Sequence, residues 1–443
     1  MSRPISRRTF IHRASALAAL SAAPTIIPST VLGKDGAVAA NERIQVGCIG
    51  VGSRGTDDLR GFLNDKNAQV VALCDVKANV LQEKQTLVNE FYGNTGCQTY
   101  ADFRDLVVRE DIDACLVATC DHWHVLAALA VVRSGKDVYM EKPMGLTLQQ
   151  DQAMRRAVHY HNRIFQFGTQ QRSDPKFRLA CELARSGKIG NIHTINVWAP
   201  GSSAGGDPTP VPVPEGLDYD FWLGPAPFKP YTQDRCSNTL WWFISDYALG
   251  FIAGWGIHPL DVALWGAPDK FKGPWRVNGK GKFPTEGVAD TAMDWDITFT
   301  MGSGCTMRYT GNPCPPEWRE RYGDDAGHGT VFEGDEGWIY VHRGLLKTYP
   351  ENLIDPAQLV QLQDQYMNST FLHVTNFLDA VRSRQQPLSD IDVSVLGDTI
   401  CHVSDIAIRL GRELTFDPEK ERFLQDKEAN QRLRGTMRKP WHL

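Results

Sequence analysis

The chain has 443 residues, 42% of them hydrophobic and 22% charged, a composition typical of a globular protein of two or three domains. Its net charge of −5 provides no basic field that would attract nucleic acid. No uninterrupted apolar run reaches the roughly 18 to 20 residues that a membrane span needs, so we expect no span in the mature protein.

The N-terminal residues 1–40 are predicted to be an export signal rather than part of the fold. The sequence SRRTFI contains Arg7 and Arg8, a soft apolar run follows at residues 14–23, and the small residues AVAA at 37–40 suit cleavage. This order resembles a twin-arginine signal peptide; a disordered basic tail is the alternative. We therefore expect a protein that is periplasmic or otherwise exported by the twin-arginine route. Because that route carries folded proteins, a cofactor would be bound before export.

The ten cysteines are predicted to be buried thiols. None has a C-x-x-C or zinc-type spacing, and Cys48, Cys74 and Cys115 fall inside apolar runs, where cysteine behaves as a small hydrophobic residue. We therefore predict neither a disulfide framework nor a metal site.

The first folded segment joins a strand at residues 44–49, a glycine loop, a helix from residue 56 and a second strand that ends at Asp75. Gly50, Gly52 and Gly55 have the G-x-G-x-x-G spacing of a dinucleotide site. The first glycine allows the tight turn, the second lets the backbone approach the pyrophosphate, and the third lets the helix pack on the strand. With flanking strands in place, the motif predicts a nucleotide-binding loop.

The residue that follows the second strand decides between NAD and NADP. Asp75 would accept hydrogen bonds from the adenosine ribose and would repel a 2′-phosphate, so NAD is favoured. Arg54 leaves NADP open, because an arginine in the loop next to Ser53 could pair with a phosphate. We expect both loop residues to contact the cofactor.

Strands and helices continue to alternate, with strands expected at residues 113–119 and 136–144 and a helix at 124–135. This order predicts a parallel sheet whose ligands bind beyond the carboxyl ends of the strands. The polar residues at those ends are Thr119, Asp121, His122, His124, Glu141 and Lys142. A surface ion pair between Glu141 and Lys142 is the alternative to a functional role.

The remainder of the chain has strand composition with two helical stretches. Strands are expected at residues 192–198, 291–301 and 305–310, a hairpin at 330–342, a helix at 369–383 and a long loop at 201–215.

Two apolar segments in this part of the chain contain residues that are candidates for a functional role. Trp241 lies in LWWFI, close to Asp246 and Tyr247, and these residues suit either a sugar-binding surface or plain core. In GIHPLD, His258 and Asp261 lie one helical turn apart in an otherwise apolar helix, where an unpaired charge would be costly.

Several motifs in this order resemble the Gfo/Idh/MocA family, which is named for glucose–fructose oxidoreductase and inositol dehydrogenase. The resemblance rests on GCIGVGSRG (47–55), ATCDHWH (118–124), EKP (141–143), GTQQRS (168–173) and GIHPLD (256–261). LDYDFWLGPAP (217–227) further resembles a twin-arginine-exported branch that is frequent in planctomycetes and Bacteroidetes.

The resemblance implies an α/β fold with an N-terminal Rossmann dinucleotide-binding domain (41–165) and a C-terminal α/β domain (166–443). The second domain would have an open, mainly antiparallel sheet that carries the substrate pocket and the contact of a homo-oligomer. The substrate would be a carbohydrate or polyol. His258 would act as general acid and base, and Lys142 would polarise the reacting oxygen. Asp261 would orient the histidine or hold another hydroxyl, and Arg172 in GTQQRS would contact the substrate.

One residue departs from the family pattern. The dehydrogenase branch usually has an aspartate where this chain has Gly254, so another acid such as Asp246 replaces it or the chemistry differs. Three functions therefore stay open: an NAD(H)-linked oxidoreductase acting on a sugar, sugar derivative or glycoside; an enzyme that uses tightly bound NAD in a closed redox cycle, as a glycosidase, epimerase or sugar–sugar oxidoreductase; and a non-catalytic carbohydrate-binding relative.

Overall fold

The computed structural model describes residues 38–39, 42–237, 239–311, 314–323, 326–355 and 369–443. The predicted export signal, with Arg7 and Arg8, and its boundary at residue 40 lie outside the described residues. Residues 44–443 form one unit by their contacts. No helix in the described ranges is long and apolar enough to cross a membrane.

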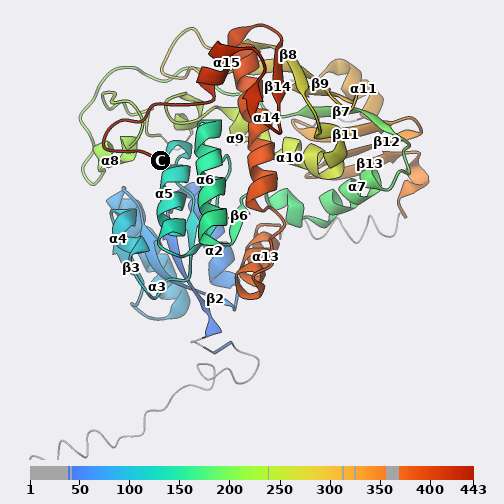
Figure 1. The fold of residues 1–443 in the computed structure, drawn as a ribbon. Coiled ribbons are helices and arrows are strands. Elements are labelled where there is room, and N and C mark those ends of the chain that lie inside the picture. Colours follow the sequence, from blue (N-terminus) through green and yellow to red (C-terminus); the bar gives the residue numbers. More distant parts are fainter. Residues whose placement is uncertain (1–37, 40–41, 238, 312–313, 324–325, 356–368) are drawn as a thin grey trace, which may run out of the picture. The chain divides into compact units, whose positions relative to one another are not determined.

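The first half is a parallel sheet, drawn in blue and teal in Figure 1. It has six strands in the order β3-β2-β1-β4-β5-β6, which agrees with the predicted Rossmann domain. Its strands are β1 (Ile44–Ile49), β2 (Ala68–Cys74), β3 (Gln98–Tyr100), β4 (Ala114–Val117), β5 (Asp137–Met140) and β6 (Phe165–Phe167). Its helices are α2 (Ser53–Asn64), α3 (Ala78–Tyr92), α4 (Phe103–Val107), α5 (Asp121–Arg133) and α6 (Leu148–His161).

Helices cover both faces of this sheet. Successive side chains of a strand point to opposite faces, so each strand contributes to two cores. In β4, Cys115 and Val117 pack in the core formed with α4, α5 and α6. Ala114 and Leu116 pack instead with α2 and α3. This explains why the strand is apolar at every position.

The second half is a nine-stranded open sheet with the order β13-β12-β11-β7-β10-β9-β8-β14-β15. Every neighbouring pair is antiparallel except β7 and β10, which confirms the predicted mainly antiparallel sheet. Its strands are β7 (Ile192–Trp198), β8 (Trp275–Lys282), β9 (Asp294–Met301), β10 (Thr306–Thr310), β11 (Gly329–Gly334), β12 (Gly337–His342), β13 (Leu345–Tyr349), β14 (Leu414–Asp417) and β15 (Arg422–Phe423).

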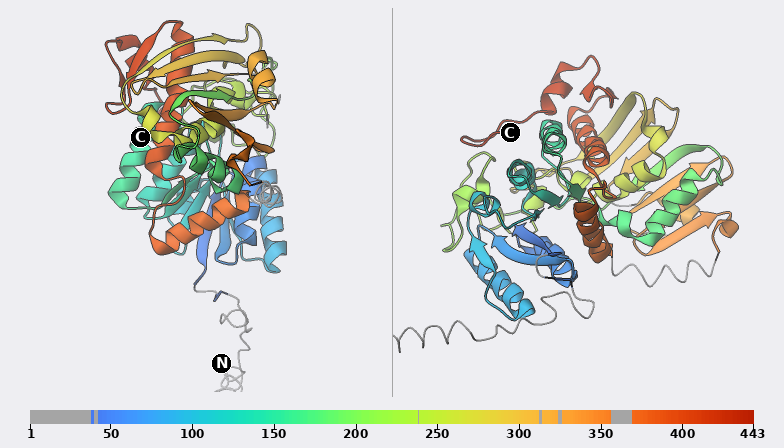
Figure 2. Two further views of the ribbon diagram at one scale, coloured as in Figure 1. Left: turned by 90° about the vertical axis from the view of Figure 1, so that its right-hand side faces the viewer. Right: turned by 60° about the horizontal axis from the view of Figure 1, so that its bottom comes forward.

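Helices cover one face of this sheet, as both views in Figure 2 show. They are α7 (Pro175–Arg185), α10 (Ile257–Gly266) and α14 (Ile391–Leu410), which lie side by side and contact β12, β11 and β8 respectively. The shorter helices are α8 (Tyr219–Leu223), α9 (Phe251–Gly254), α11 (Pro316–Tyr322) and α15 (Lys427–Arg432). The stretch 201–215 contains only an isolated bridge at Gly205, which confirms the predicted loop.

The predicted domain boundary at residue 165 falls inside β6. The chain also returns to the first half at α13 (Ser369–Ser383), whose Val374 and Phe377 pack in one core with Phe62 of α2. Helix α14 then packs against both α6 and α10, so one helix contacts both halves (Figure 1). The two sheets are therefore held together by helices rather than joined by a linker.

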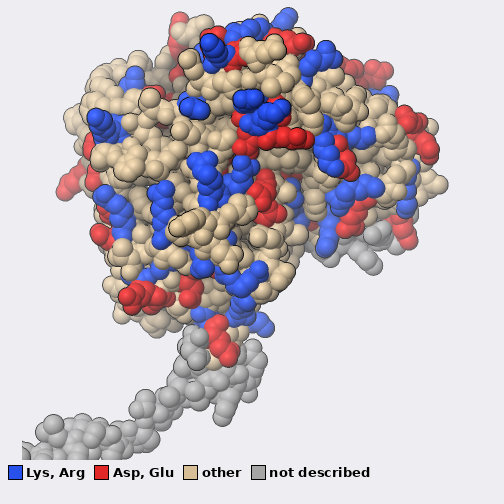
Figure 3. All heavy atoms as spheres, in the orientation of Figure 1, with Lys and Arg blue, Asp and Glu red and all other residues tan. Residues whose placement is uncertain are grey.

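The surface carries charges of both signs (Figure 3), and the cysteines are buried or partly buried. Basic and acidic side chains are interspersed on the face shown in Figure 3. The ten cysteines are thiols, and all but the partly buried Cys120 are buried.

Candidate active site

The loop between β1 and α2 allows a ligand to approach the backbone closely. Gly50 has a φ of +79°, and a Cβ there would lie 2.5 Å from the carbonyl oxygen of Ala118. A Cβ at Gly55 would lie 2.1 Å from the oxygen of Gly50, whereas a Cβ at Gly52 would meet no described atom within 4 Å. No described side chain caps α2, so its first N–H groups can bind an anion. This cradle fits the pyrophosphate of a dinucleotide.

Asp75 follows β2 and is fixed by two backbone hydrogen bonds. The N–H of Val51 donates to Oδ2 and the N–H of Lys77 donates to Oδ1, each at 3.0 Å. Burial raises the pKa of the Asp75 carboxyl, although these hydrogen bonds oppose the rise. The carboxylate oxygens keep further lone pairs that can accept from ribose hydroxyls.

Arg54 is held by two carboxylates rather than left for a phosphate. Its Nε donates to Oε1 of Glu141 at 3.0 Å, and a terminal nitrogen pairs with Asp58. Glu141 also accepts hydrogen bonds from the Nε2 of Gln170 at 2.6 Å and from the backbone N–H of Lys142 at 3.0 Å. Burial alone would raise the pKa of Glu141, but the charges of Arg54 and Lys142 lower it. Glu141 therefore pairs with Arg54 and is not a surface partner of Lys142.

The segment from the end of β4 to the start of α5 brings three further predicted residues to the pocket. The ring nitrogens of His124 lie 2.6 Å from the carbonyl oxygen of Pro143 and 3.0 Å from that of Thr119, which links the ends of β4 and β5. Oδ2 of Asp121 is buried with no hydrogen-bond partner among the described residues. Burial raises the pKa of Asp121 well above its usual value, and the charge of Lys142 opposes the rise.

The side chain of Lys142 points to the segment that precedes α10. Its Nζ donates to the carbonyl oxygen of Gly254 at 2.7 Å and lies 6.0 Å from the ring centroid of Trp242. Burial lowers the pKa of Lys142, which the charges of Glu141 and Asp121 only partly offset. Gly254 stands where the family usually has an aspartate, and its backbone oxygen accepts the hydrogen bond from Lys142.

His258, in the first turn of α10, is 3% exposed, and its Nδ1 has no hydrogen-bond partner in the described part of the chain. Burial lowers the pKa of His258 well below its usual value, and the charges of Arg343 and Lys142 lower it further. The imidazole is therefore neutral near pH 7 and can accept a proton.

One pocket of about 390 Å³ joins the glycine loop to His258. The predicted site residues that line it are Gly50, Gly52, Ser53, Arg54, Gly55, Asp75, Thr119, Asp121, His124, Glu141, Lys142, Trp241 and His258. Trp241 and Trp242 face this pocket while Phe243 and Ile244 are buried, so LWWFI serves as both site and core.

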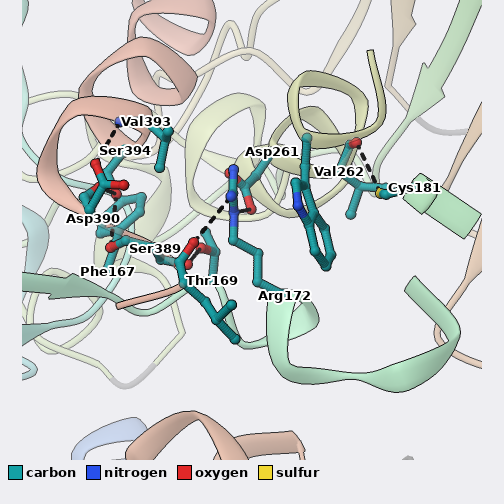
Figure 4. Close-up of polar contacts among 12 residues, drawn as sticks. Phe167, Thr169, Arg172, Cys181, Asp261, Val262, Ser389, Asp390, Val393 and Ser394 are labelled. Atoms are coloured by element: carbon teal, nitrogen blue, oxygen red, sulfur yellow. Dashed lines mark hydrogen bonds and ion pairs between the residues drawn. The ribbon is translucent and has the colours of Figure 1, made fainter. Parts of the chain in front are cut away.

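Four predicted residues lie elsewhere, which corrects their expected positions. Arg172 and Asp261 form a buried ion pair with each other, and Arg172 also donates to the carbonyl oxygen of Leu388 (Figure 4). Asp261 therefore does not orient His258. Tyr247 is fully buried, with its ring 4.8 Å from that of Trp222.

Asp246 is the fourth residue and does not replace the family's aspartate at Gly254. It is partly buried outside the pocket that holds Lys142 and His258. Burial raises the pKa of its carboxyl.

The pocket residues that sequence reasoning did not assign to the site include Trp242, Trp255 and Arg343. Trp242 lies within LWWFI and Trp255 directly precedes GIHPLD, so aromatic composition could have indicated both. Arg343 lies in the turn between β12 and β13 and carried no signal, because only the sheet brings that turn to His258.

A buried polar cluster lies outside the pocket, where α6 meets α14. Asp151, Asp398 and His402 could offer three metal ligands within 4.8 Å of one another. The Nε2 of His402 lies 2.9 Å from Asp151. The charge of Asp151 raises the pKa of His402 to about 10, although burial opposes the rise. His402 therefore pairs with Asp151, whereas both carboxylate oxygens of Asp398 are buried without a hydrogen-bond partner among the described residues.

Known proteins are similar to parts of this chain in sequence. The curated relatives include glycosyl hydrolase family 109 proteins of Saccharopolyspora erythraea (35% identical over 164 residues, 34% of this chain and 36% of the relative) and of Shewanella amazonensis (33% over 136 residues, 29% of each). The matched segments span only about a third of these relatives' length.

Solved structures share the fold at low sequence identity. The WlbA dehydrogenase from Bordetella pertussis, in complex with NADH and UDP-GlcNAcA, has a TM-score of 0.65 at 15% identity and covers 85% of this chain and 98% of its own. Myo-inositol 2-dehydrogenase from Lactobacillus plantarum has a TM-score of 0.59 at 18% identity and covers 85% and 99%.

The family itself is settled by sequence models of its two domains. The model described as an oxidoreductase family, NAD-binding Rossmann fold, matches residues 44–169. The model described as an oxidoreductase family, C-terminal alpha/beta domain, matches residues 197–443, more than half of the chain. The chain therefore belongs to the Gfo/Idh/MocA oxidoreductase family, with an NAD-binding Rossmann domain.

Proposed function

We propose that this protein is an NAD(H)-dependent oxidoreductase that acts on a hydroxyl group of a sugar, sugar derivative or glycoside. The observation that carries the proposal is that Lys142 and His258 line the same pocket as the glycine loop and Asp75. A proton-accepting group, a cation and a dinucleotide cradle are what the oxidation of an alcohol requires.

NAD, when bound, supplies the acceptor for the hydride that leaves the substrate carbon. When the alcohol is oxidised to a carbonyl, its hydroxyl loses a proton, and the neutral imidazole of His258 accepts that proton. The ammonium of Lys142, fixed by Gly254, donates a hydrogen bond to the reacting oxygen and stabilises its developing negative charge. Asp75 and the N-terminus of α2 hold the opposite end of the cofactor.

A closed redox cycle on retained NAD is the second candidate. It is supported by the similarity of 164 residues to a protein named glycosyl hydrolase family 109 protein. It also agrees with the proposal of twin-arginine export, because an exported enzyme has no obvious NAD pool with which to exchange its cofactor. We also infer that the chain belongs to the twin-arginine-exported branch. We further infer a homo-oligomer formed through the nine-stranded sheet, and light scattering measures that oligomeric state.

The experiment is to purify the protein, measure released nucleotide after denaturation, and screen neutral and acidic sugars and their glycosides. In a net oxidation, the amount of added NAD that is reduced exceeds the amount of protein. In a closed cycle, the sugar is transformed and no added NAD is consumed. If NAD is bound but no sugar reduces it or is transformed, the non-catalytic alternative replaces the proposal.

Two variants test the roles of the catalytic pair. Lys142→Ala and His258→Ala should each lower turnover by about 10²- to 10⁴-fold while NAD binding is retained. The double variant should be hardly worse, because residues that act as one unit are not additive. The matched control is Lys347→Ala, in β13 outside the pocket. Normal turnover in His258→Ala would contradict the proposed role.

A further inference from the structure

The end of the pocket near His258 carries one cation for which no described carboxylate compensates. Arg54 is neutralised by Glu141 and Asp58. Lys142 donates to a backbone oxygen and is close enough to Asp121 for their charges to interact. Arg343 also lines this pocket, and within the described residues no carboxylate forms an ion pair with it.

Among the described residues, the contacts that hold Arg343 in place leave the hydrogen-bond donors of its side chain available. Its guanidinium carbon lies 4.7 Å from the ring centroid of Trp255, a stacking distance. Its backbone carbonyl accepts from the Nζ of the buried Lys176 at 2.9 Å. Its backbone N–H donates to the Nε2 of His328 at 3.5 Å. The side chain is therefore pre-oriented, which lowers the entropy cost of binding an anion.

Because no carboxylate among the described residues pairs with Arg343, its charge has an electrostatic cost at this position. Its charge acts on both His258 and Lys142, and like charges near one another are unfavourable. An anion bound at the guanidinium would relieve that repulsion. The neighbouring indoles of Trp241, Trp242 and Trp255 supply apolar faces against which a sugar ring can pack.

We propose that Arg343 binds the carboxylate of an acidic sugar, so that the substrate is a hexuronic acid or a glycoside of one. The planar fork of the guanidinium matches a carboxylate in two parallel hydrogen bonds. A single positive charge balances a single carboxylate, whereas a phosphate monoester would bring nearly two negative charges. This inference rests on the proposed function, because it takes the sugar to bind beside Lys142 and His258.

The test uses the NAD-loaded full-length protein with glucuronate, galacturonate, glucose, galactose and glucose 6-phosphate as probes. Binding is followed by the fluorescence of Trp255 and its neighbours, and reaction by reduction of bound NAD. We expect the wild type to prefer a uronate. Arg343→Gln should raise the KM for that uronate about 10- to 100-fold, the loss of a charged hydrogen-bond pair, with a smaller change in kcat. Arg343→Lys should recover part of the loss.

Arg276→Gln is the matched control, because Arg276 is an exposed arginine of β8 in the same sheet and should leave the KM unchanged. An unchanged uronate KM in Arg343→Gln, or equal losses for neutral and acidic sugars, would overturn the inference. Stronger binding of glucose 6-phosphate than of either uronate would also overturn it, in favour of a phosphate. If bound NAD is never reduced, the proposed function fails, while uronate binding in wild type and Arg343→Gln still decides the role of Arg343.

Discussion

Arg172 and Asp261 form a two-point ion pair in the interior, with Nε 2.8 Å from Oδ2 and a terminal nitrogen 2.7 Å from Oδ1 (Figure 4). Their side chains are only 6% and 4% exposed. The pair ties the 3₁₀ helix η2 (Gln170–Ser173), which follows β6, to α10. It therefore fixes the helix that presents His258 without touching the pocket.

Removing one partner of this pair should destabilise the protein without affecting the cofactor. Arg172→Ala leaves the carboxylate of Asp261 buried and unpaired, a loss of about 3–5 kcal/mol in the free energy of unfolding. The double variant Arg172→Met/Asp261→Leu should recover most of that loss. Urea unfolding and NAD titration measure the two effects. Wild-type stability in Asp261→Asn together with lost turnover would instead show that Asp261 acts in catalysis.

The position of Asp261 shows where sequence reasoning reaches its limit. Helical spacing places residues 258 and 261 near the same face, but α10 is buried on nearly every side. Small angular differences therefore direct His258 to the pocket and Asp261 to Arg172, a residue far away in the sequence. No local pattern encodes that choice.

The nucleotide loop, by contrast, could be predicted because local sequence specifies each of its parts. β1, Gly50, α2, β2 and Asp75 follow one another along the chain, and each is specified by its own residues. The strand and helix at Ile192–Trp198 and Ser369–Ser383 also have their predicted bounds. Arg343 could not be predicted, because its place depends on the pairing of β11, β12 and β13.

The pH dependence of turnover should report the neutral state of His258. Burial and the nearby charges of Arg343, Lys142, Arg54 and His328 lower its pKa, so the base form persists in mild acid. The acidic limb of the kcat/KM profile, which reports the free enzyme, should lie below the usual histidine value of about 6.5. In Arg343→Gln one positive charge is lost, the pKa of His258 rises, and the limb should move to higher pH. An unmoved limb would mean that another group titrates.

Gly254 should tolerate a side chain. Its backbone is not left-handed, and the nearest described atom to an added Cβ is a carbon of Phe251 at 3.9 Å. Gly254→Ala should therefore leave the free energy of unfolding within about 0.5 kcal/mol of the wild type. Gly254→Asp would add a negative charge near Lys142 and raise its pKa, which moves the basic limb of the pH profile upward. A large loss in the free energy of unfolding of Gly254→Ala would show that position 254 has no room for a Cβ.

Export should depend on the arginine pair at the N-terminus. Replacing Arg7 and Arg8 by lysine preserves the charge but removes the feature that the twin-arginine route recognises. The variant should accumulate in the cytoplasm, folded and loaded with NAD. Cell fractionation with an antibody to the mature chain measures this, and an Arg13→Lys variant is the control. Continued delivery of the paired variant to the periplasm would show that another signal directs export.

Asp75 and Arg54 should have separable effects on the choice of cofactor. Asp75→Ala removes the ribose acceptor, so NAD binding should weaken about 10- to 100-fold while NADP binding, freed from charge repulsion, weakens less. Arg54→Gln should leave the ratio of NAD to NADP affinity unchanged, because Glu141 and Asp58 already hold the guanidinium. Calorimetric titration of both cofactors into the stripped protein measures the ratio. A preference of the wild type for NADP that Arg54→Gln abolishes would show that Arg54 leaves its carboxylates to bind the 2′-phosphate.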